Sequence, residues 1–403
     1  MKGSDLELTI GERVAFYRRR RGLTQVALAG LVNRTTSWIE KVENGRVPLD
    51  RISVVRDLAR ALDISLHDLL PDDVAEVDPP SRGKSVPALR DLVLSYRAVN
   101  PRFALLDEDV EVTRISELSV MVDDIWRAYQ DSRFGYVVMR LNQVLPLAYV
   151  ATRDPSVRRE ANRCLAYLYQ VAASVLVKLG DLDLARLCAD RGDIAAQDVG
   201  DLVTTTSRQR SIAHTLLSNG QYGEAVAVVR EGVIDAAEPE DPSSLSVVGT
   251  LILVGATASA RAGERAEAAA FLRHASQLAE RLGRDGNEIW TSFGPTNVAI
   301  HRVTVAAELG DIHEAVKLGA AVDVTSMPRE RRVRHQLEVA RALARSGRNE
   351  ESLATLLSAE RGASEQVRRH FLTHELVHAW IRTTRTRPSP DLVALARRLG
   401  HAA

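Results

Sequence analysis

The sequence predicts an all-α protein in which a small N-terminal domain of five short helices precedes a solenoid of helical hairpins. Three observations predict this class. Apolar residues recur at the three- and four-residue spacing of amphipathic helices through most of the chain. No alternating run of Val, Ile or Thr bounded by turn residues indicates a strand. A glycine followed five residues later by a small residue recurs from residue 180 onward, which indicates a structural repeat.

Length and composition agree with a folded, multi-domain protein of the cytoplasm. The chain has 403 residues, of which 45% are hydrophobic, and its 53 basic residues balance its 53 acidic residues. Only two cysteines occur, which fits a reducing compartment. The longest weakly polar run, VVGTLILVGATASA, has about 14 residues where about 20 are needed to cross a bilayer. No secretory signal is visible, so we expect no membrane partner.

Residues 1–70 are expected to form the five short helices. The sequence TIGE at 9–12 is a capping box that opens the first helix, and SLHD at 65–68 opens the last one before Pro71 ends it. The segment 71–87 contains four prolines and little apolar periodicity. This composition is typical of a linker between domains.

Residues 88–403 are expected to form the solenoid. A glycine can adopt the left-handed conformation that ends a helix, and a small residue in the next helix lets the two cross closely. Successive glycines are 40, 43, 47 and 37 residues apart, and the array resembles the tetratricopeptide superfamily with longer helices. Such a stack has a concave groove lined by the first helix of each pair. The pairs are Gly180 with Ala185, Gly220 with Ala225, Gly263 with Ala268, Gly310 with Ala315 and Gly347 with Ser352.

The segment 21–46 has the spacing of a helix-turn-helix. A helix from Gln25 to Val32, capped by Thr24, is expected to precede a helix from Thr36 to Glu43, capped by Thr35. The turn between them needs a residue that tolerates positive φ, and Asn33 is the best choice after glycine. The buried faces are expected to contain Leu28, Ala29, Val32, Ile39 and Val42.

The outer face of the second helix has the chemistry of a DNA recognition helix. Side chains at i and i+4 spacing point away from the core, where hydroxyls can serve several bases and Lys41 can donate to guanine O6 and N7. The flanking polar residues and the basic run Arg18–Arg21 are suited to phosphates, and Gln25 also reaches toward a base edge. The candidate DNA-binding residues are Gln25, Arg34, Thr35, Thr36, Ser37, Glu40, Lys41, Asn44 and Arg46.

The stretches GLTQVALAGLV, TTSWIEKVENG and LDRISVVRDLARALDISLHDLL resemble the helix-turn-helix domain of the λ-repressor/Cro-like (XRE) family. With the repeats behind it, the chain resembles actinobacterial XRE regulators that carry a C-terminal tetratricopeptide-like region. The resemblance implies a dimeric transcription factor whose third helix enters the DNA groove. Two positions depart from the family pattern, because Asn33 replaces the usual turn glycine and Arg34 occupies a position that is usually apolar.

The sequence HELVH at 374–378 matches the zinc-peptidase pattern in which two histidines share a helix face. A working site needs a third ligand, yet no glutamate follows Glu375, and Ile381 and Thr384 stand where the extended motif requires Gly and His. We interpret the stretch as a packed helix of the solenoid and expect no enzyme activity, metal or cofactor. A zinc peptidase remains the least favoured alternative, with Asp391 or His401 as its conceivable third ligand.

A second unusual stretch runs from residue 290 to residue 311. Pro295 suits a first helical turn, and Asn297 and His301 then lie at i and i+4 on one stripe. An Asn amide can bind a peptide backbone with donor and acceptor together, as in the peptide-sensing repeat regulators that this region resembles in architecture. An equally open interpretation is that both side chains satisfy neighbouring helix ends. The candidate ligand-binding residues are Trp290, Phe293, Asn297 and His301, with Tyr136, Arg140 and Gln143 as weaker ones.

The sequence therefore predicts a cytoplasmic homodimer that regulates transcription. Its expected partners are a near-palindromic operator in double-stranded DNA and a peptide or small-molecule effector. In this interpretation residues 1–70 bind DNA, residues 71–87 are a linker and residues 88–403 sense the effector and dimerise. The alternative from another class is a protein-interaction adaptor whose helix-turn-helix has lost DNA binding.

Overall fold

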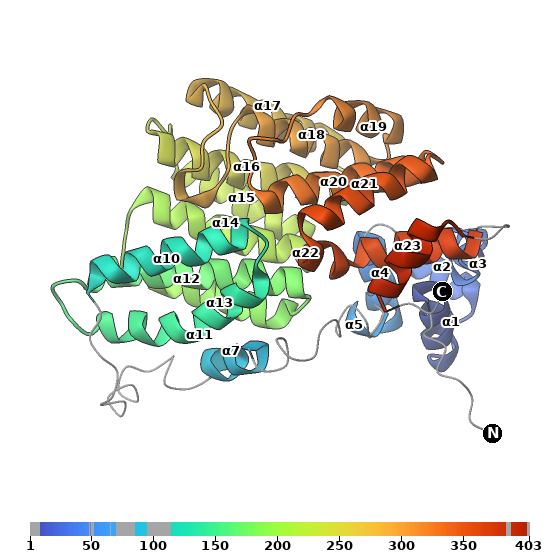
Figure 1. The fold of residues 1–403 in the computed structure, drawn as a ribbon, viewed down its shortest axis with the longest axis horizontal. Coiled ribbons are helices and arrows are strands. Elements are labelled where there is room, and N and C mark those ends of the chain that lie inside the picture. Colours follow the sequence, from blue (N-terminus) through green and yellow to red (C-terminus); the bar gives the residue numbers. More distant parts are fainter. Residues whose placement is uncertain are drawn as a thin grey trace. The chain divides into compact units, whose positions relative to one another are not determined.

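The computed structural model describes residues 9–47, 49, 52–64, 66–69, 85–94, 114–383 and 388–400. Every regular element in these ranges is a helix and none is a strand (Figure 1). Contacts between Cα atoms divide the chain into two compact units, residues 78–338 and residues 1–77 together with 339–403. The predicted all-α class is therefore confirmed.

Five helices follow one another in the N-terminal part, in the predicted order. The capping box at the start of the first is present, because the Thr9 backbone N–H donates to Glu12 at 2.8 Å and the Glu12 N–H donates to Thr9 Oγ1 at 3.3 Å. The expected cap at Ser65 and the stop at Pro71 lie outside the described residues. The helices are α1 (Ile10–Arg20), α2 (Gln25–Leu31), α3 (Thr36–Glu43), α4 (Ile52–Leu62) and α5 (Leu66–Leu69).

One apolar core holds these five helices together. Its side chains come from the inward stripe of each helix, so that Val14, Leu28, Ile39 and Leu58 are all fully buried. Helices α1 and α3 approach closely at Gly11, where a Cβ atom would lie 2.2 Å from the carbonyl oxygen of Val42. A glycine is required at this crossing because the obstacle is backbone.

The same unit contains four helices from the C-terminal part of the chain. Glu360 of α21 accepts hydrogen bonds from Arg368 at 2.9 Å and from Arg398 at 2.8 and 2.7 Å, which ties α22 and α24 to α21. The HELVH stretch lies in α23, where His374 is fully buried with Nε2 2.7 Å from the Arg368 carbonyl oxygen. The helices are α21 (Asn349–Gly362), α22 (Ser364–Arg368), α23 (Phe371–Thr383) and α24 (Pro390–Arg398).

The other unit is a stack of helical hairpins (Figure 1). The predicted linker overlaps its first described helix, which begins at Ser85, and residues 70–84 lie outside the described residues. The last helix of the stack, α20, crosses the boundary between the units. The helices are α7 (Ser85–Leu94), α10 (Ile115–Gln130), α11 (Phe134–Ala151), α12 (Arg158–Leu179), α13 (Leu182–Gln197), α14 (Leu202–Ser218), α15 (Tyr222–Asp235), α16 (Pro242–Ala262), α17 (Arg265–Leu282), η2 (Glu288–Trp290), α18 (Pro295–Leu309), α19 (Ile312–Ala321) and α20 (Arg329–Arg345).

The glycine rule read from the sequence describes the hairpin corners. The five repeat glycines have φ between 72° at Gly220 and 88° at Gly310, which is the left-handed region that ends a helix. The small residue five positions later has no exposed surface in any of the five pairs. Each corner therefore combines a glycine stop with a close helix crossing, as predicted.

The first helices of successive hairpins pack against one another in the order α10, α12, α14, α16, α18. Helix α16 is the most apolar of them. It corrects the expectation that no apolar segment of the chain is long enough to cross a bilayer. Its 21 residues make it long and apolar enough to cross a membrane by length and composition, although the apolar run alone was shorter. The helix is longer because Asp241 caps it and Pro242 starts it. Neighbouring helices bury 89% of its most apolar window, which accounts for that composition.

Candidate nucleic-acid interface and cationic cavity

The two helices of the predicted helix-turn-helix end and begin within one residue of the expected positions. Thr24 Oγ1 accepts from the Ala27 N–H at 3.1 Å, and Thr35 Oγ1 accepts from the Trp38 N–H at 3.2 Å. Asn33 has φ 50°, so it supplies the left-handed turn that its residue type indicated. The two threonine caps and the turn at Asn33 therefore fix the orientation of α3 relative to α2.

Helix α3 has one buried face and one exposed face. Ile39 and Val42 are buried in the core, whereas Thr36, Ser37 and Lys41 are exposed, as is Glu40 between them. The exposed set occupies i, i+1, i+4 and i+5 and so covers about one third of the helix circumference. The geometry leaves this face open for the major groove, and DNA contact by it stays a prediction.

The flanking candidates have other roles as well. The guanidinium of Arg34 lies over the Trp38 ring, 5.5 Å from its centroid, which explains how a charged residue occupies a usually apolar position. Thr35 uses its hydroxyl as a helix cap. Asn44 and Arg46 have exposed side chains, and the Asn44 carbonyl oxygen accepts from Arg382 at 3.0 Å.

A buried ion pair joins the end of α3 to α1, and the sequence analysis did not predict it. Arg18 donates from Nε to Glu43 Oε1 at 2.5 Å and from Nη2 to Oε2 at 2.8 Å, and Gln25 Nε2 donates to the same Oε2 at 2.8 Å. Burial opposes ionisation of Glu43, but the hydrogen bonds from Arg18 and Gln25 hold its pKa below the usual range. Arg18 and Gln25 were expected to contact phosphates or bases. The signal for their internal role is that Glu43 follows buried Ile39 by four residues.

A cavity of about 130 Å³ lies inside the hairpin stack. Its helical walls come from the first helices of the hairpins and from the start of α20. Four of them, α12, α14, α16 and α18, each contribute a stripe at i, i+4 and i+7 or i+8 spacing. Examples are Gln170, Ser174 and Lys178 of α12. The other stripes are Arg210, His214 and Leu217 of α14, Thr250, Val254 and Thr257 of α16, and Asn297, His301 and Thr304 of α18.

Four cationic side chains and one acid line this cavity. They are Lys178, Arg210, Arg331 and Arg334 against Glu330. Lys178 Nζ lies 2.5 Å from Glu330 Oε1, and Arg334 Nε lies 3.5 Å from Glu338 outside the lining. Burial opposes the charge on Glu330, yet Lys178 and the neighbouring arginines lower its pKa, so the acid is ionised. Burial and the charge of Arg331 lower the pKa of Arg210 to about 10, so it too remains charged near neutral pH.

Asn297 is the most unusual polar residue of the lining. Its side chain has no exposed surface, and within the described residues neither its Oδ1 nor its Nδ2 makes a hydrogen bond. Its backbone carbonyl oxygen lies 2.9 Å from His301 Nδ1. Since a carbonyl only accepts, His301 carries its proton on Nδ1. An unpaired buried amide costs about 1 to 3 kcal/mol, so a ligand that pairs with Asn297 recovers stability.

Trp290 reaches the cavity from a strained loop. Ile289, Trp290 and Ser292 have φ between 48° and 54°, a region that non-glycine residues rarely adopt. The Trp290 ring stacks on Trp126 of α10 with centroids 5.2 Å apart and an interplanar angle of 4°. The amides of Gln130 and Asn287 exchange hydrogen bonds at 2.9 and 3.0 Å, which fixes the loop against α10. Strain held in place this way is a feature of binding sites.

The remaining ligand candidates lie away from the cavity lining. Phe293 is fully buried in the core, and its ring fills the space beside Gly249. Tyr136 and the pair Arg140 and Gln143 belong to α11, a second helix of a hairpin. Tyr136 donates to Asp124 Oδ2 at 2.8 Å, and Arg140 Nη1 donates to Gln143 at 2.7 Å. The sequence analysis did not predict the cationic residues of the lining. The signal was available, because the i and i+4 spacing of Asn297 and His301 recurs among the lining residues of the other first helices.

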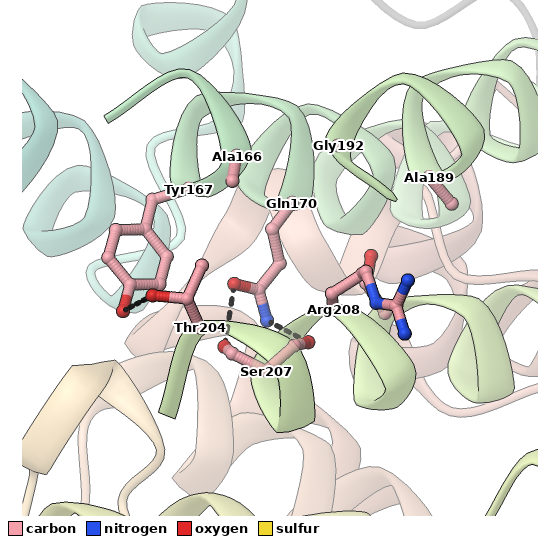
Figure 2. Close-up of a pocket in the computed structure, with 9 residues that line it drawn as sticks. Ala166, Tyr167, Gln170, Ala189, Gly192, Thr204, Ser207 and Arg208 are labelled. Atoms are coloured by element: carbon pink, nitrogen blue, oxygen red, sulfur yellow. Dashed lines mark hydrogen bonds between the residues drawn. The ribbon is translucent and has the colours of Figure 1, made fainter. Parts of the chain in front are cut away.

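A smaller pocket of about 10 Å³ lies between α12, α13 and α14. Figure 2 shows Gln170 pointing toward Ser207 across this pocket. Gln170 Nε2 donates to the Ser207 carbonyl at 3.1 Å, and Ser207 Oγ donates back to Gln170 Oε1 at 2.9 Å. This amide is satisfied by the protein itself, in contrast to Asn297. Among the described residues, no group of three or more His, Cys, Asp or Glu is placed to hold a metal ion.

The two histidines of the cavity predict a loss of stability in acid. Burial and the surrounding cations lower the pKa of His214 and of His301 to about 3, against about 6.5 in an unfolded chain. The unfolded state therefore binds protons first, and the stabilisation is complete above about pH 6.5 and is lost as the pH falls toward 3. Each histidine is expected to add up to about 1.4 kcal/mol per pH unit to the slope of the unfolding free energy.

Urea denaturation of the full chain between about pH 7 and about pH 5 measures this slope. His214→Asn and His301→Asn should each make the slope shallower, whereas His313→Asn on the exposed side of α19 should leave it unchanged. Equal slopes in all three variants would contradict the assignment.

Comparison with known proteins assigns the N-terminal domain. Residues 9–70 match a family model described as a helix-turn-helix domain, and no curated protein matches the chain. Two solved structures are similar at low identity. PlcR of Bacillus thuringiensis, in complex with the peptide PapR7 and DNA, is 13% identical with a TM-score of 0.38, covering 77% of this chain and 92% of its own. ComR of S. thermophilus, in complex with DNA and its signalling peptide ComS, is 12% identical with a TM-score of 0.33, covering 82% and 99%.

Proposed function

We propose that the protein is a cytoplasmic, sequence-specific DNA-binding regulator of transcription whose hairpin stack senses an effector. The observation that carries this proposal is the exposed face of α3 on a capped helix-turn-helix, within the residues that match the helix-turn-helix family model. Residues 1–70 bind DNA, residues 71–87 link the domains, and the tetratricopeptide-like residues 88–403 hold the effector and dimerise. No enzymatic step is part of the proposal.

In the proposed complex α3 lies in the major groove. Thr36 and Ser37 contact base edges, and Lys41 donates to guanine. Glu40 lies between them and is suited to accept from a cytosine amino group. The phosphate contacts come from Arg34, Asn44 and Arg46, with Thr35 and the outer edge of Gln25 at the helix starts.

One such helix reads only a few base pairs, so we propose a homodimer on a near-palindromic operator. The half-site centres are then about 10 base pairs apart, or a multiple of that distance. The effector occupies the cationic cavity, where Trp290, Asn297 and His301 are lining residues. Its binding changes the separation of the two DNA-binding heads and shifts the population between binding and non-binding arrangements.

Gel-shift titration at several salt concentrations tests the DNA-binding part of the proposal. DNA captured across a genome by the protein supplies candidate operators. A true operator should bind at least ~10³-fold more tightly than random DNA at the same salt. A protein-interaction adaptor would show only weak, strongly salt-dependent binding to every duplex, and that result would refute the proposal.

Lys41→Ala separates base contact from phosphate contact. If Lys41 donates to a base, the substitution should cost about 1 to 3 kcal/mol on the operator and much less on random DNA. The measurement is the dissociation constant on both duplexes at one salt concentration. Lys317→Ala, an exposed lysine of α19 outside the helix-turn-helix, is the matched control and should leave both constants unchanged. Equal losses on both duplexes would assign Lys41 to a phosphate instead.

A further inference from the structure

We propose that the cavity in the hairpin stack binds a compact amphipathic ligand that presents one oxyanion, a carboxylate or a phosphate, next to an amide and an apolar group. The inference rests on the proposed function in taking this cavity as the effector site, and it adds the chemical class of the effector. Three features of the lining support it, and each concerns a different part of the ligand.

The first feature is an excess of positive charge. Four cations line the cavity; Lys178 pairs with Glu330, and Arg334 pairs with Glu338. Arg210 and Arg331 repel each other, and within the described residues the buried Nε of each makes no hydrogen bond. Guanidinium groups bind carboxylates and phosphates through paired N–H donors. An oxyanion therefore supplies the missing acceptors and removes the repulsion.

The second feature is the unpaired amide of Asn297. Its Oδ1 accepts and its Nδ2 donates, so an amide group of a ligand satisfies both atoms at once. The contrast with Gln170 is direct, because there a side-chain hydroxyl and a backbone carbonyl of the protein fill the same two positions. Asn297 has no surface open to water, so water does not satisfy these two atoms in the empty fold, and a ligand reaches them only when a neighbouring side chain of the lining moves.

The third feature is the apolar part of the lining and its size. Leu253, Ile300 and the stacked pair Trp126 and Trp290 offer apolar and aromatic surface beside the charged wall. An engineered cavity of about 150 Å³ holds one benzene, so an interior of about 130 Å³ accepts one small apolar group with a charged end. A long polyanion such as a nucleic acid does not fit this interior.

The test uses defined probes on the full-length protein. N-acetyl-leucine carries the carboxylate, amide and apolar chain, N-acetyl-leucinamide lacks only the charge, and phenyl phosphate replaces the carboxylate by a phosphate. Titration calorimetry should give N-acetyl-leucine, phenyl phosphate or both at least ~10-fold tighter binding than N-acetyl-leucinamide. The stronger of the two acids identifies the oxyanion.

Variants then locate the binding. Arg331→Gln should weaken the better acid by ~10-fold or more and leave N-acetyl-leucinamide unchanged, whereas Arg230→Gln on the exposed side of α15 should change neither. Asn297→Ala should weaken the probes that contain an amide and spare phenyl phosphate. Competition by sulfate against the acid in the unmodified protein gives a second measurement that does not depend on any variant folding.

Two results overturn the inference. One is that neither N-acetyl-leucine nor phenyl phosphate binds more tightly than N-acetyl-leucinamide, and the other is the absence of binding by all three probes. A protein that binds its operator but none of the probes retains the proposed DNA-binding function and loses this inference. A protein that binds the acids in the cavity but has no operator retains the site and loses the proposed function.

Discussion

Replacing Gly11 by alanine is expected to destabilise the helix-turn-helix domain by about 2 to 3 kcal/mol and to abolish specific DNA binding. The added Cβ would lie 2.2 Å from the Val42 carbonyl oxygen and 3.2 Å from its carbon. Because these are backbone atoms, α1 or α3 must move, and overpacking of this kind costs about 1 to 3 kcal/mol or more. A displaced α3 also loses the position from which its exposed face would meet the groove.

Gly30→Ala is the matched control for this substitution. Gly30 lies in α2, and no atom is within 4 Å of the position that its Cβ would occupy. Alanine is the better helix former, so the variant should be unchanged or more stable by about 0.5 to 1 kcal/mol. Chemical denaturation followed by circular dichroism, together with operator binding, measures both variants. A Gly11→Ala protein as stable as Gly30→Ala would show that the two helices do not cross at Gly11.

Arg18→Met is expected to destabilise the same domain by about 3 kcal/mol, because it leaves Glu43 buried without its cation. Arg18 and Glu43 have side-chain exposures of only 11% and 5%, so solvent cannot replace the lost partner. The Arg18 Nη1 bond to the Leu23 carbonyl at 2.9 Å is lost as well. The expected readout is a lower denaturation midpoint of the helix-turn-helix transition.

Two further variants show whether the ion pair itself is responsible. Arg19→Met changes the exposed neighbour of Arg18 and should alter stability by less than about 0.5 kcal/mol. The double variant Arg18→Met with Glu43→Leu removes both charges, and replacing a buried pair by apolar residues is often neutral or stabilising. Recovery of stability in the double variant is therefore expected. A double variant as unstable as Arg18→Met would mean that packing of the arginine stem, and not its charge, supports the domain.

The parts of the fold that the sequence predicted are those decided by local physics. Thr24 and Thr35 cap their helices because a hydroxyl before a helix accepts a free backbone N–H, whatever lies elsewhere. Asn33 and the hairpin glycines take positive φ for equally local steric reasons. The membrane-length helix α16 shows the limit, because its burial depends on neighbours that are distant in the sequence.

The site was predicted only in part, for the same physical reason. Asn297 and His301, which line the cavity, could be named as candidates because both lie on one turn of one helix. The cations Lys178, Arg210 and Arg331 come from three helices, and their proximity depends on how the hairpins stack. Gln25 and Arg18 were predicted to contact DNA because their side chains suit phosphates or bases. Both donate to Glu43, and the sequence does not reveal this contact because Glu43 looks like an ordinary polar residue at the end of a helix.

The cluster of cations around the cavity is expected to affect the rate at which the protein is degraded in the cell. Repulsion between neighbouring arginines lowers the stability of the empty fold, and a bound anion that neutralises them raises it by mass action. At a ligand concentration about one hundred times the dissociation constant the gain is about 2.7 kcal/mol, which is enough to alter proteolytic turnover several-fold. If the proposed ligand is the natural effector, the number of copies of the protein per cell is expected to follow the supply of that ligand.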